Sequence, residues 1–408
     1  MSTLSNAQGQ PPSAMAGLRF QVSLLAVMQA LLLTNNVTMV AVNGLAGFQL
    51  ATNKLMATLP VTGYVFGGAV FAMPAAAVMR RLGRRAGYTI GSVVALGGAA
   101  LAWYALTHRS LLLLCLSTFV CGFYNAFGAS LRFAAADVAD AYRPDFRARA
   151  ISLVLAGGIV GGVVGPELSK WSRTALPIEF AGTYLTLIAF GLLSLMLAQL
   201  LRLPDRYAKA PEGPVRSLSE ILSQPRAWIA IVTCALSYGV MNLLMVSTPL
   251  AMDVCRHPYS STALVLEWHV IGMFAPGLVT GSLISRFGVI PIIVTGCALM
   301  LACVGVALSG VDLMQFLAAL FLLGVGWNFM YTGGTTLLTA SYRPQEKNKV
   351  QGFTDFCVFG LMITSSASSG ALLFSTGWAL LNLLSLPLIL VGLATSLWLA
   401  RQVGWRAV

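Results

Sequence analysis

Charged residues are scarce in this sequence. Only 9% of its 408 residues are Asp, Glu, Lys or Arg, whereas 57% are hydrophobic and the mean hydropathy is +0.81. Ordinary soluble domains have a charged fraction of about 25%, so this balance excludes a set of such domains. We therefore expect an integral membrane protein whose main partner is the lipid bilayer.

Several motifs of soluble proteins are missing as well. The seven cysteines include no CxxC pair, so the sequence predicts no disulfide framework. No Gly-rich phosphate-binding loop occurs, which argues against a pump driven by nucleotide hydrolysis in this chain. We expect a protein that is not an enzyme and has no resident cofactor. Residues 1–17 lack the basic start of a signal peptide and are predicted to be a disordered cytoplasmic tail.

Long apolar runs recur from end to end, each near the roughly 20 residues that a helix needs to cross a membrane. Hydropathy and helix-breaking residues predict spans near 18–43, 53–79, 87–107, 110–140, 147–169 and 179–202. After a polar centre, further spans are predicted near 226–253, 262–286, 289–309, 312–341, 348–374 and 377–400. The expected fold class is therefore all-α integral membrane, with twelve transmembrane helices.

The positive charges gather in alternate loops. If both termini lie on one side, about 19 of the 25 Lys and Arg residues fall on that side and five on the other. Basic loops face the cytoplasm, so both termini are predicted to be cytoplasmic, which requires an even number of spans. The net charge of +12 thus has a topological cause, and we expect no nucleic-acid partner.

The two halves of the chain echo each other. Tyr142-Arg143-Pro144 recurs about two hundred residues later as Tyr342-Arg343-Pro344, with basic residues at the same distances behind it. A weaker echo matches Arg81-Leu82-Gly83 with Arg286-Phe287-Gly288. These echoes indicate a duplication, with an N-terminal bundle at 18–203, a cytoplasmic linker at 204–225 and a C-terminal bundle at 226–408.

Parallel six-span repeats joined by a basic linker resemble the major facilitator superfamily over the whole chain. The loop from Ala76 to Arg85 resembles that family's G-x-x-x-D-R-x-G-R-R signature, except that Arg80 replaces the acidic residue. If the family's charge relay operates here, Asp137 or Asp140 is the nearest candidate for the acidic partner. The alternative is that these charges only set the topology.

Two spans carry pairs of candidate metal ligands. Met241 and Met245 stand at i and i+4 in the seventh span, and His269 and Met273 do so in the eighth, so each pair shares one helix face. At a rise of about 1.5 Å per residue, Met245 and His269 lie roughly 12 and 10 Å from the outer ends of their spans, and Met241 and Met273 roughly 18 and 16 Å. Thioethers with one imidazole fit copper best.

Simpler interpretations remain open for these residues. Methionines are common in membrane helices, whereas an ionisable residue such as His269 inside a span is a functional candidate by default. Cys234, which shares nearly the face of Met241, and Cys255, at the outer end of the same span, could extend the path of a thiophilic ion. Small buried cysteines in membrane helices are otherwise packing residues.

The MxxxM and HxxxM motifs resemble the pattern of the CcoA-type copper importers within that superfamily. The resemblance implies uptake of copper across the bacterial inner membrane, for assembly of a cbb3-type cytochrome oxidase. Met241, Met245, His269 and Met273 carry over as ligands. Copper would then be the substrate, and copper chaperones on the cytoplasmic side would be partners.

Two other functions compete with copper import. One is a proton-coupled transporter of an organic molecule, either a drug exporter or a carrier of riboflavin-like cargo. Gly157, Gly161 and Gly165-Pro166 in the fifth span would then resemble the antiporter motif, although a small-residue stripe is also a packing face. The other is a membrane copper sensor without transport, which would bind copper without accumulating it.

Overall fold

The computed structural model describes residues 12–128, 130–143, 146–203 and 214–405. These residues form helices and no strand. The first part of the chain consists of α1 (Pro12–Leu50), the 3-10 helix η1 (Lys54–Met56), α2 (Leu59–Thr107), α3 (Leu111–Gly128), α4 (Leu131–Tyr142), α5 (Arg147–Ser172) and α6 (Ala181–Leu200). The second part consists of α7 (Leu218–Leu222), α8 (Pro225–Val254), α9 (Tyr259–Phe274), α10 (Gly277–Phe287), α11 (Val289–Ser309), α12 (Leu313–Thr339), the 3-10 helix η3 (Pro344–Glu346) and α13 (Lys347–Val403).

The described residues contain ten helical stretches that are long and apolar enough to cross a membrane. Two of them, Lys54–Thr107 and Pro344–Val403, have 54 and 60 residues. At about 1.5 Å per residue each is longer than two membrane thicknesses of roughly 30 Å. Each also breaks at a glycine with non-helical backbone angles, Gly83 in α2 and Gly377 in α13. Each therefore supplies two crossings, which gives the twelve that the sequence predicts.

The glycines at these reversals have a backbone conformation that side chains exclude. Gly83, Gly288 and Gly377 have φ values of 83°, 96° and 79° with ψ values of 160°, 163° and 171°. This region is essentially reserved for glycine, because a Cβ atom would clash with the backbone there. Gly83 and Gly288 are the matching glycines of the weaker sequence echo, so the duplicated motif is a duplicated turn.

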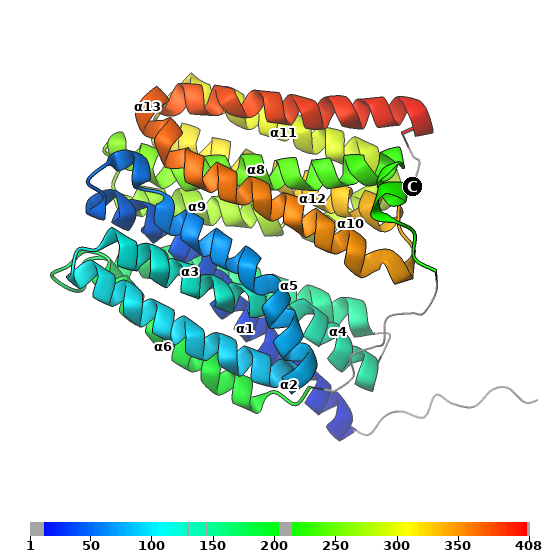
Figure 1. The fold of residues 1–408 in the computed structure, drawn as a ribbon, viewed down its shortest axis with the longest axis horizontal. Coiled ribbons are helices and arrows are strands. Elements are labelled where there is room, and N and C mark those ends of the chain that lie inside the picture. Colours follow the sequence, from blue (N-terminus) through cyan, green and yellow to red (C-terminus); the bar gives the residue numbers. More distant parts are fainter. Residues whose placement is uncertain (1–11, 129, 144–145, 204–213, 406–408) are drawn as a thin grey trace, which may run out of the picture.

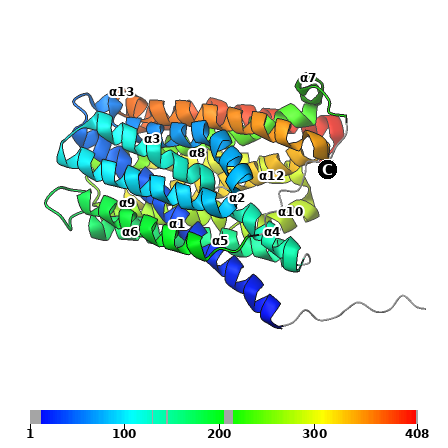
Figure 2. The same ribbon diagram turned by 60° about the horizontal axis from the view of Figure 1, so that its bottom comes forward.

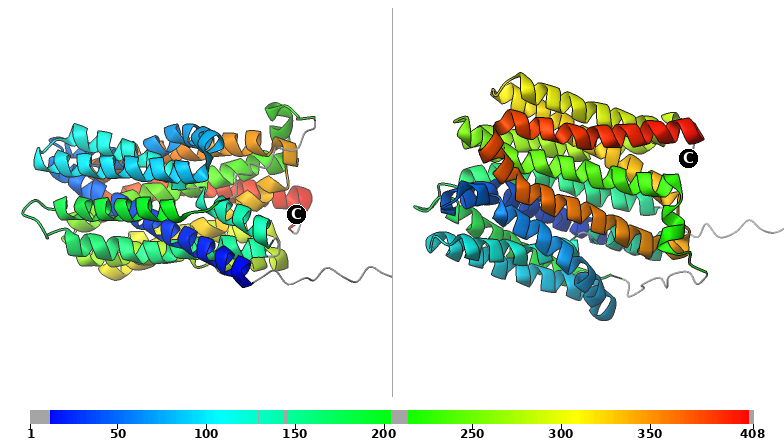
Figure 3. Two further views of the ribbon diagram at one scale, coloured as in Figure 1. Left: turned by 90° about the horizontal axis from the view of Figure 1, so that it is seen from below. Right: turned by 45° about the horizontal axis from the view of Figure 1, so that its top comes forward.

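The helices pack as two bodies. In the first, α1 packs against α5, and α2 packs against α3 and α6; in the second, α8 packs against α13 and α12, and α11 packs against α12. Figure 1 shows the two bodies one above the other, and Figure 3 shows the part of α13 before Gly377 alongside the first part of α2. The arrangement confirms the predicted helical fold of two six-crossing halves.

The two ends of the bundle differ in charge. We call the end that carries the turns at Gly83 and Gly288 the basic side, and the end that carries η1 and the turn at Gly377 the opposite side. The start of α1 and the end of α13 both lie on the basic side, together with the short helix α7 (Figures 1 and 2). The two ends of the chain lie on the same side because the chain crosses the bundle an even number of times. That the basic side is cytoplasmic stays a prediction.

The predicted tail and linker lie partly outside the described residues, which begin at Pro12 and skip 204–213. Within the described part, α1 starts at Pro12, before the predicted start at residue 18, and the linker contains α7. The linker is attached to the second half. Arg216 donates to the buried carboxylate of Glu346 through Nε at 2.8 Å and Nη2 at 2.7 Å, and Lys349 donates to the Arg216 carbonyl at 3.0 Å.

Contacts between the halves concentrate on the opposite side. Thr62 of α2 donates to Ser366 of α13 at 3.2 Å, and Phe48 of α1 stacks on Phe374 of α13 with ring centroids 5.2 Å apart. A further hydrogen bond of 2.6 Å joins the hydroxyls of Ser169 on α5 and Tyr259 on α9. Helix α9, the part of the eighth predicted span nearer the opposite side, is thus held against α5.

Toward the basic side the same helix faces are open. Phe66 and Met73 lie on the face of α2 that carries Thr62, and their side chains are 48% and 83% exposed. Asp355 lies on the face of α13 that carries Ser366, and it is exposed too. The two halves therefore touch on the opposite side and diverge toward the basic side, as their ribbons do in Figure 1.

Candidate transport site

The imidazole of His269 lies at a tight contact between two helices. Its side chain is fully buried, and Nδ1 shares a hydrogen bond of 2.8 Å with the carbonyl of Leu320 on α12. A Cβ atom on Gly324 of α12 would lie only 2.5 Å from the His269 carbonyl oxygen, so glycine allows this close approach. Within the described residues, Nε2 of His269 has no hydrogen-bond partner.

The other predicted copper ligands are buried in the second half. Met241, Met245 and Met273 all belong to one apolar core. Helix α9 packs mainly against α12 and α5, and α8 mainly against α13 and α12, so α12 is the neighbour that α8 and α9 share. The four-ligand cluster of Met241, Met245, His269 and Met273 stays a prediction.

The two cysteines occupy different surroundings. Cys234 is buried where α8 meets α12, with its Sγ 3.9 Å from the Thr335 hydroxyl, whereas Cys255 is partly exposed at the end of α8. Their role in a copper path also stays a prediction. In the part of the chain that the structure describes, no three His, Cys, Asp or Glu side chains gather as a metal site.

An aromatic cluster lies between α8 and α12. The rings of Trp327 and Tyr331 on α12 stack with centroids 5.3 Å apart and planes within 10°. Tyr238 of α8 meets both rings edge-on, at 5.1 Å from Trp327 and 4.9 Å from Tyr331. These are the preferred geometries of aromatic pairs. The indole Nε1 of Trp327 is buried and has no acceptor among the described residues.

Two opposite charges face this aromatic cluster from different halves. Arg132 on α4 and Asp355 on α13 both lie within electrostatic range of Tyr238 and Tyr331, and within range of each other. Both side chains are exposed, although both lie in apolar spans. The sequence left these two charges without a role. Arg132 and Asp355 therefore bring opposite charges from the two halves into the neighbourhood of the aromatic cluster.

Asparagines form a polar chain in the first half. Asn36 of α1 donates to Asn125 of α3 at 3.0 Å, and the Tyr64 hydroxyl of α2 donates to Asn36. About two hundred residues later, Asn242 of α8 donates to Ser365 of α13 at 3.0 Å, and Asn328 of α12 donates to the Met273 carbonyl at 2.7 Å. The duplication thus preserved an amide in the first and fourth crossings of each half, where these amides tie neighbouring helices together.

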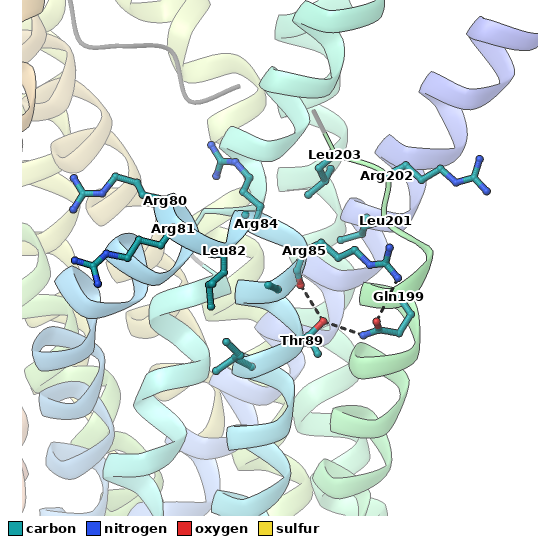
Figure 4. Close-up of a pocket in the computed structure, with 13 residues that line it drawn as sticks. Arg80, Arg81, Leu82, Arg84, Arg85, Thr89, Gln199, Leu201, Arg202 and Leu203 are labelled. Atoms are coloured by element: carbon teal, nitrogen blue, oxygen red, sulfur yellow. Dashed lines mark hydrogen bonds between the residues drawn. The ribbon is translucent and has the colours of Figure 1, made fainter. Parts of the chain in front are cut away.

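The arginine-rich turn of the first half surrounds a cavity of about 810 Å³ at the basic side (Figure 4). Arg80, Arg81 and Arg85 line it, and Arg85 reaches toward Gln199 at 3.5 Å. Asp137 on α4 forms an ion pair of 2.7 Å with Arg84. The turn thus has an acidic partner on α4, although Arg80 stands where the superfamily signature has its aspartate. This cavity lies at the basic end of the bundle, away from the aromatic cluster.

One carboxylate that the sequence did not single out lies inside a span. Glu267 lies on α9 and is only 9% exposed, and Glu167 of α5 acts on it. A single acidic residue within the apolar run from 262 to 286 was itself a sequence signal, because charges inside membrane spans are costly. Its partner in the other half depends on the packing of α5 against α9.

Comparison with known proteins resolves the family. A model of the Major Facilitator Superfamily matches residues 22–365. This chain belongs to that superfamily. A protein named riboflavin transporter RfnT, from Brucella anthropi, is 38% identical over 91% of this chain and 93% of its own length. The uncharacterised transporter YddS from Bacillus subtilis is 27% identical over 90% of this chain and 88% of its own length.

Two solved transporter structures share the fold. The nucleoside transporter NupG superposes with a TM-score of 0.74 at 14% identity, covering 93% of this chain and 99% of its own. A bacterial homologue of the lysosomal transporter Spinster, in an inward-facing and occupied conformation, superposes with a TM-score of 0.70 at 15% identity. It covers 96% of this chain and 98% of its own. Copper appears in none of these names.

Proposed function

We propose that this transporter carries a riboflavin-like molecule, a flat heteroaromatic ring with a polar chain, across the bacterial inner membrane by alternating access. The observation that carries the proposal is the 38% identity to the riboflavin transporter over nine tenths of both chains. Fold alone would not support a cargo, because one fold hosts many functions.

The aromatic cluster supports a flat ring system as cargo. Tyr238 and Tyr331 are partly exposed and can stack on a flat ring. Trp327 is only 5% exposed and supports them, by stacking on Tyr331 and packing against Tyr238, and its Nε1 is a buried donor without a partner in the described chain. Arg132 can donate to the carbonyl oxygens of such a ring, and Asp355 can accept from hydroxyl groups. Because Arg132 belongs to the first half and Asp355 to the second, a cargo between them would contact both moving bodies.

Binding of riboflavin to the purified protein tests this proposal without regard to the direction of transport. Stacking against aromatic side chains quenches flavin fluorescence, so a titration gives the dissociation constant. Each lost aromatic pair costs about 0.5–1.5 kcal/mol, and we expect Trp327→Ala to weaken binding by about tenfold. Trp268 is 43% exposed on α9, so Trp268→Ala is the matched control and should leave binding unchanged.

Uptake assays decide between the cargoes. Cells that lack riboflavin synthesis and their own importer should accumulate riboflavin when they produce this protein. Copper remains the second candidate, because the buried Nε2 of His269 is unpartnered among the described residues and Met273 lies one turn away. Parallel uptake of riboflavin, copper and zinc separates the two. Copper uptake that His269→Ala abolishes, without riboflavin uptake, would refute the organic cargo.

A further inference from the structure

Two carboxyl groups from different halves meet where the halves are closed. The face of α9 that packs on α5 carries Tyr259, Glu267 and Val270. The Tyr259 hydroxyl is hydrogen-bonded to Ser169 of α5. Val270 lies so close to Gly162 of α5 that a Cβ atom added to Gly162 would be 2.2 Å from the Cγ1 of Val270. Glu267 lies between these two contacts, and the Glu167 carboxyl of α5 is within hydrogen-bonding reach of the Glu267 carboxyl.

The surroundings of Glu267 leave its charge uncompensated. Glu267 is 9% exposed, and its Oε1 is buried without a hydrogen-bond partner in the described residues. Two ionised carboxylates can only accept hydrogen bonds, so the pair is satisfied only when one carboxyl holds a proton or both bind a cation. A buried polar group without a partner is rare enough to call for a ligand as its explanation.

The surroundings supply two positive charges, and one of them is already neutralised: Arg173, which follows α5, lies 4.9 Å from the centre of the Tyr259 ring and pairs with Glu179. Lys170 of α5 binds Glu167 at 2.6 Å and acts on Glu267. Helix α12, the other main neighbour of α9, carries no charged residue. The charged residues of α1 and α8 are Arg19, Arg226 and Asp253, all near helix ends, and α10 carries Arg286 in its last turn. Two carboxylates and one ammonium leave a net charge of −1 at a closed contact inside the membrane.

We propose that the Glu167–Glu267 pair binds one small monovalent cation, a sodium ion or a proton, and that this cation allows the halves to close on the opposite side. Oxygen ligands and a single missing positive charge suit either ion. When the halves rock open on that side, α5 and α9 separate, and the two carboxylates meet water from that compartment. Cation uptake therefore accompanies closure, and the pair links cation movement to cargo movement.

Distances between the halves test this proposal in the absence of any cargo. Spin labels at Leu112→Cys, at the start of α3, and Val311→Cys, before α12, report the gap on the opposite side, since both residues are exposed there. The full chain in lipid nanodiscs carries serine at the partly exposed cysteines Cys115, Cys255 and Cys357. Sodium is raised at constant pH in one arm, and the pH is lowered without sodium in the other.

We expect one of the two cations to raise the closed population at least about fivefold in the unsubstituted pair. Glu267→Gln keeps the shape of the side chain and removes its charge. The variant should therefore be closed without the cation, and its closed population should change less than about twofold when the cation is added. Glu167→Gln, at an exposed position, provides the same test if Glu267→Gln fails to fold. Asp253→Asn, at the exposed end of α8, should respond as the unsubstituted protein does.

The arm that responds identifies the ion. A gap that responds to neither cation overturns the proposal, and so does a Glu267→Gln protein that responds as fully as the unsubstituted one. Because no cargo is present, neither result depends on riboflavin being the substrate.

Discussion

Gly162 gives a prediction that separates the two conformations of the transporter. It lies on α5, and a methyl group added there would come within 2.2 Å of Val270 Cγ1 and 3.0 Å of Val270 Cβ across the contact between the halves. Ordinary carbon contacts are about 3.5–4.0 Å, and the branched valine cannot turn aside freely. Gly162→Ala should therefore oppose closure on the opposite side and leave each half intact.

The size of the effect follows from the cost of overpacking, which is about 1–3 kcal/mol for one extra carbon. That cost falls on the closed conformation alone, so the ratio of closed to open molecules should drop by about 5- to 150-fold. Distance measurements between spin labels at Leu112→Cys and Val311→Cys would show this as a shift toward longer distances. Val270→Ala removes the clashing methyl groups and should restore closure in the double variant.

Gly161→Ala is the control within the same helix. Its added methyl group would lie 2.2 Å from the Ala30 carbonyl oxygen of α1, inside the first half, so both conformations should suffer. We expect a lower unfolding temperature without a change in the closed fraction. An unchanged closed fraction in Gly162→Ala would refute the reasoning, as would a Val270→Ala change that fails to rescue it.

Three further substitutions test the fold and the site. Gly83→Ala places a side chain at φ 83° and should cost about 1–3 kcal/mol, seen as a lower unfolding temperature than for Gly97→Ala, where the added Cβ meets nothing within 4 Å. Asn125→Ala leaves the amide of Asn36 without its acceptor, so it should cost about 1–3 kcal/mol in the same assay, and no loss would contradict the polar chain. Arg132→Gln removes the charge that faces the aromatic cluster, and should weaken riboflavin binding while Arg401→Gln, at the end of α13, does not.

Much of the fold could be predicted from the sequence. Hydropathy and the basic loops give twelve crossings, because each crossing must bury about twenty apolar residues and each loop must stay outside the lipid. The echo of Arg81-Leu82-Gly83 in Arg286-Phe287-Gly288 predicts matching turns, and both glycines have the backbone angles that require glycine. Helices α2 and α13 continue directly on both sides of Gly83 and Gly377, so the chain can turn back into the bundle without a long loop.

The site could be predicted only in part, because order along the chain does not give order in space. The hydrogen bond of His269 Nδ1 to Leu320 joins the eighth crossing to the tenth, a contact that the sequence did not predict, and the cluster of His269 with the methionines stays a prediction. The Glu167–Glu267 pair joins residues one hundred positions apart, and only the packing of α5 on α9 brings them together. Arg132 and Asp355 likewise come near the same aromatic cluster only when the two halves pack together.

The attachment of Arg216 to Glu346 has a consequence for measurements of motion. Arg216 precedes α7, yet its side chain and its carbonyl are both bound by residues at the start of α13. The segment from residue 214 onward therefore travels as part of the C-terminal body. A fluorophore on α7 would therefore move with the C-terminal body. Its distance from a second fluorophore on the turn near Gly83, in the other body, would report how far the basic side is open.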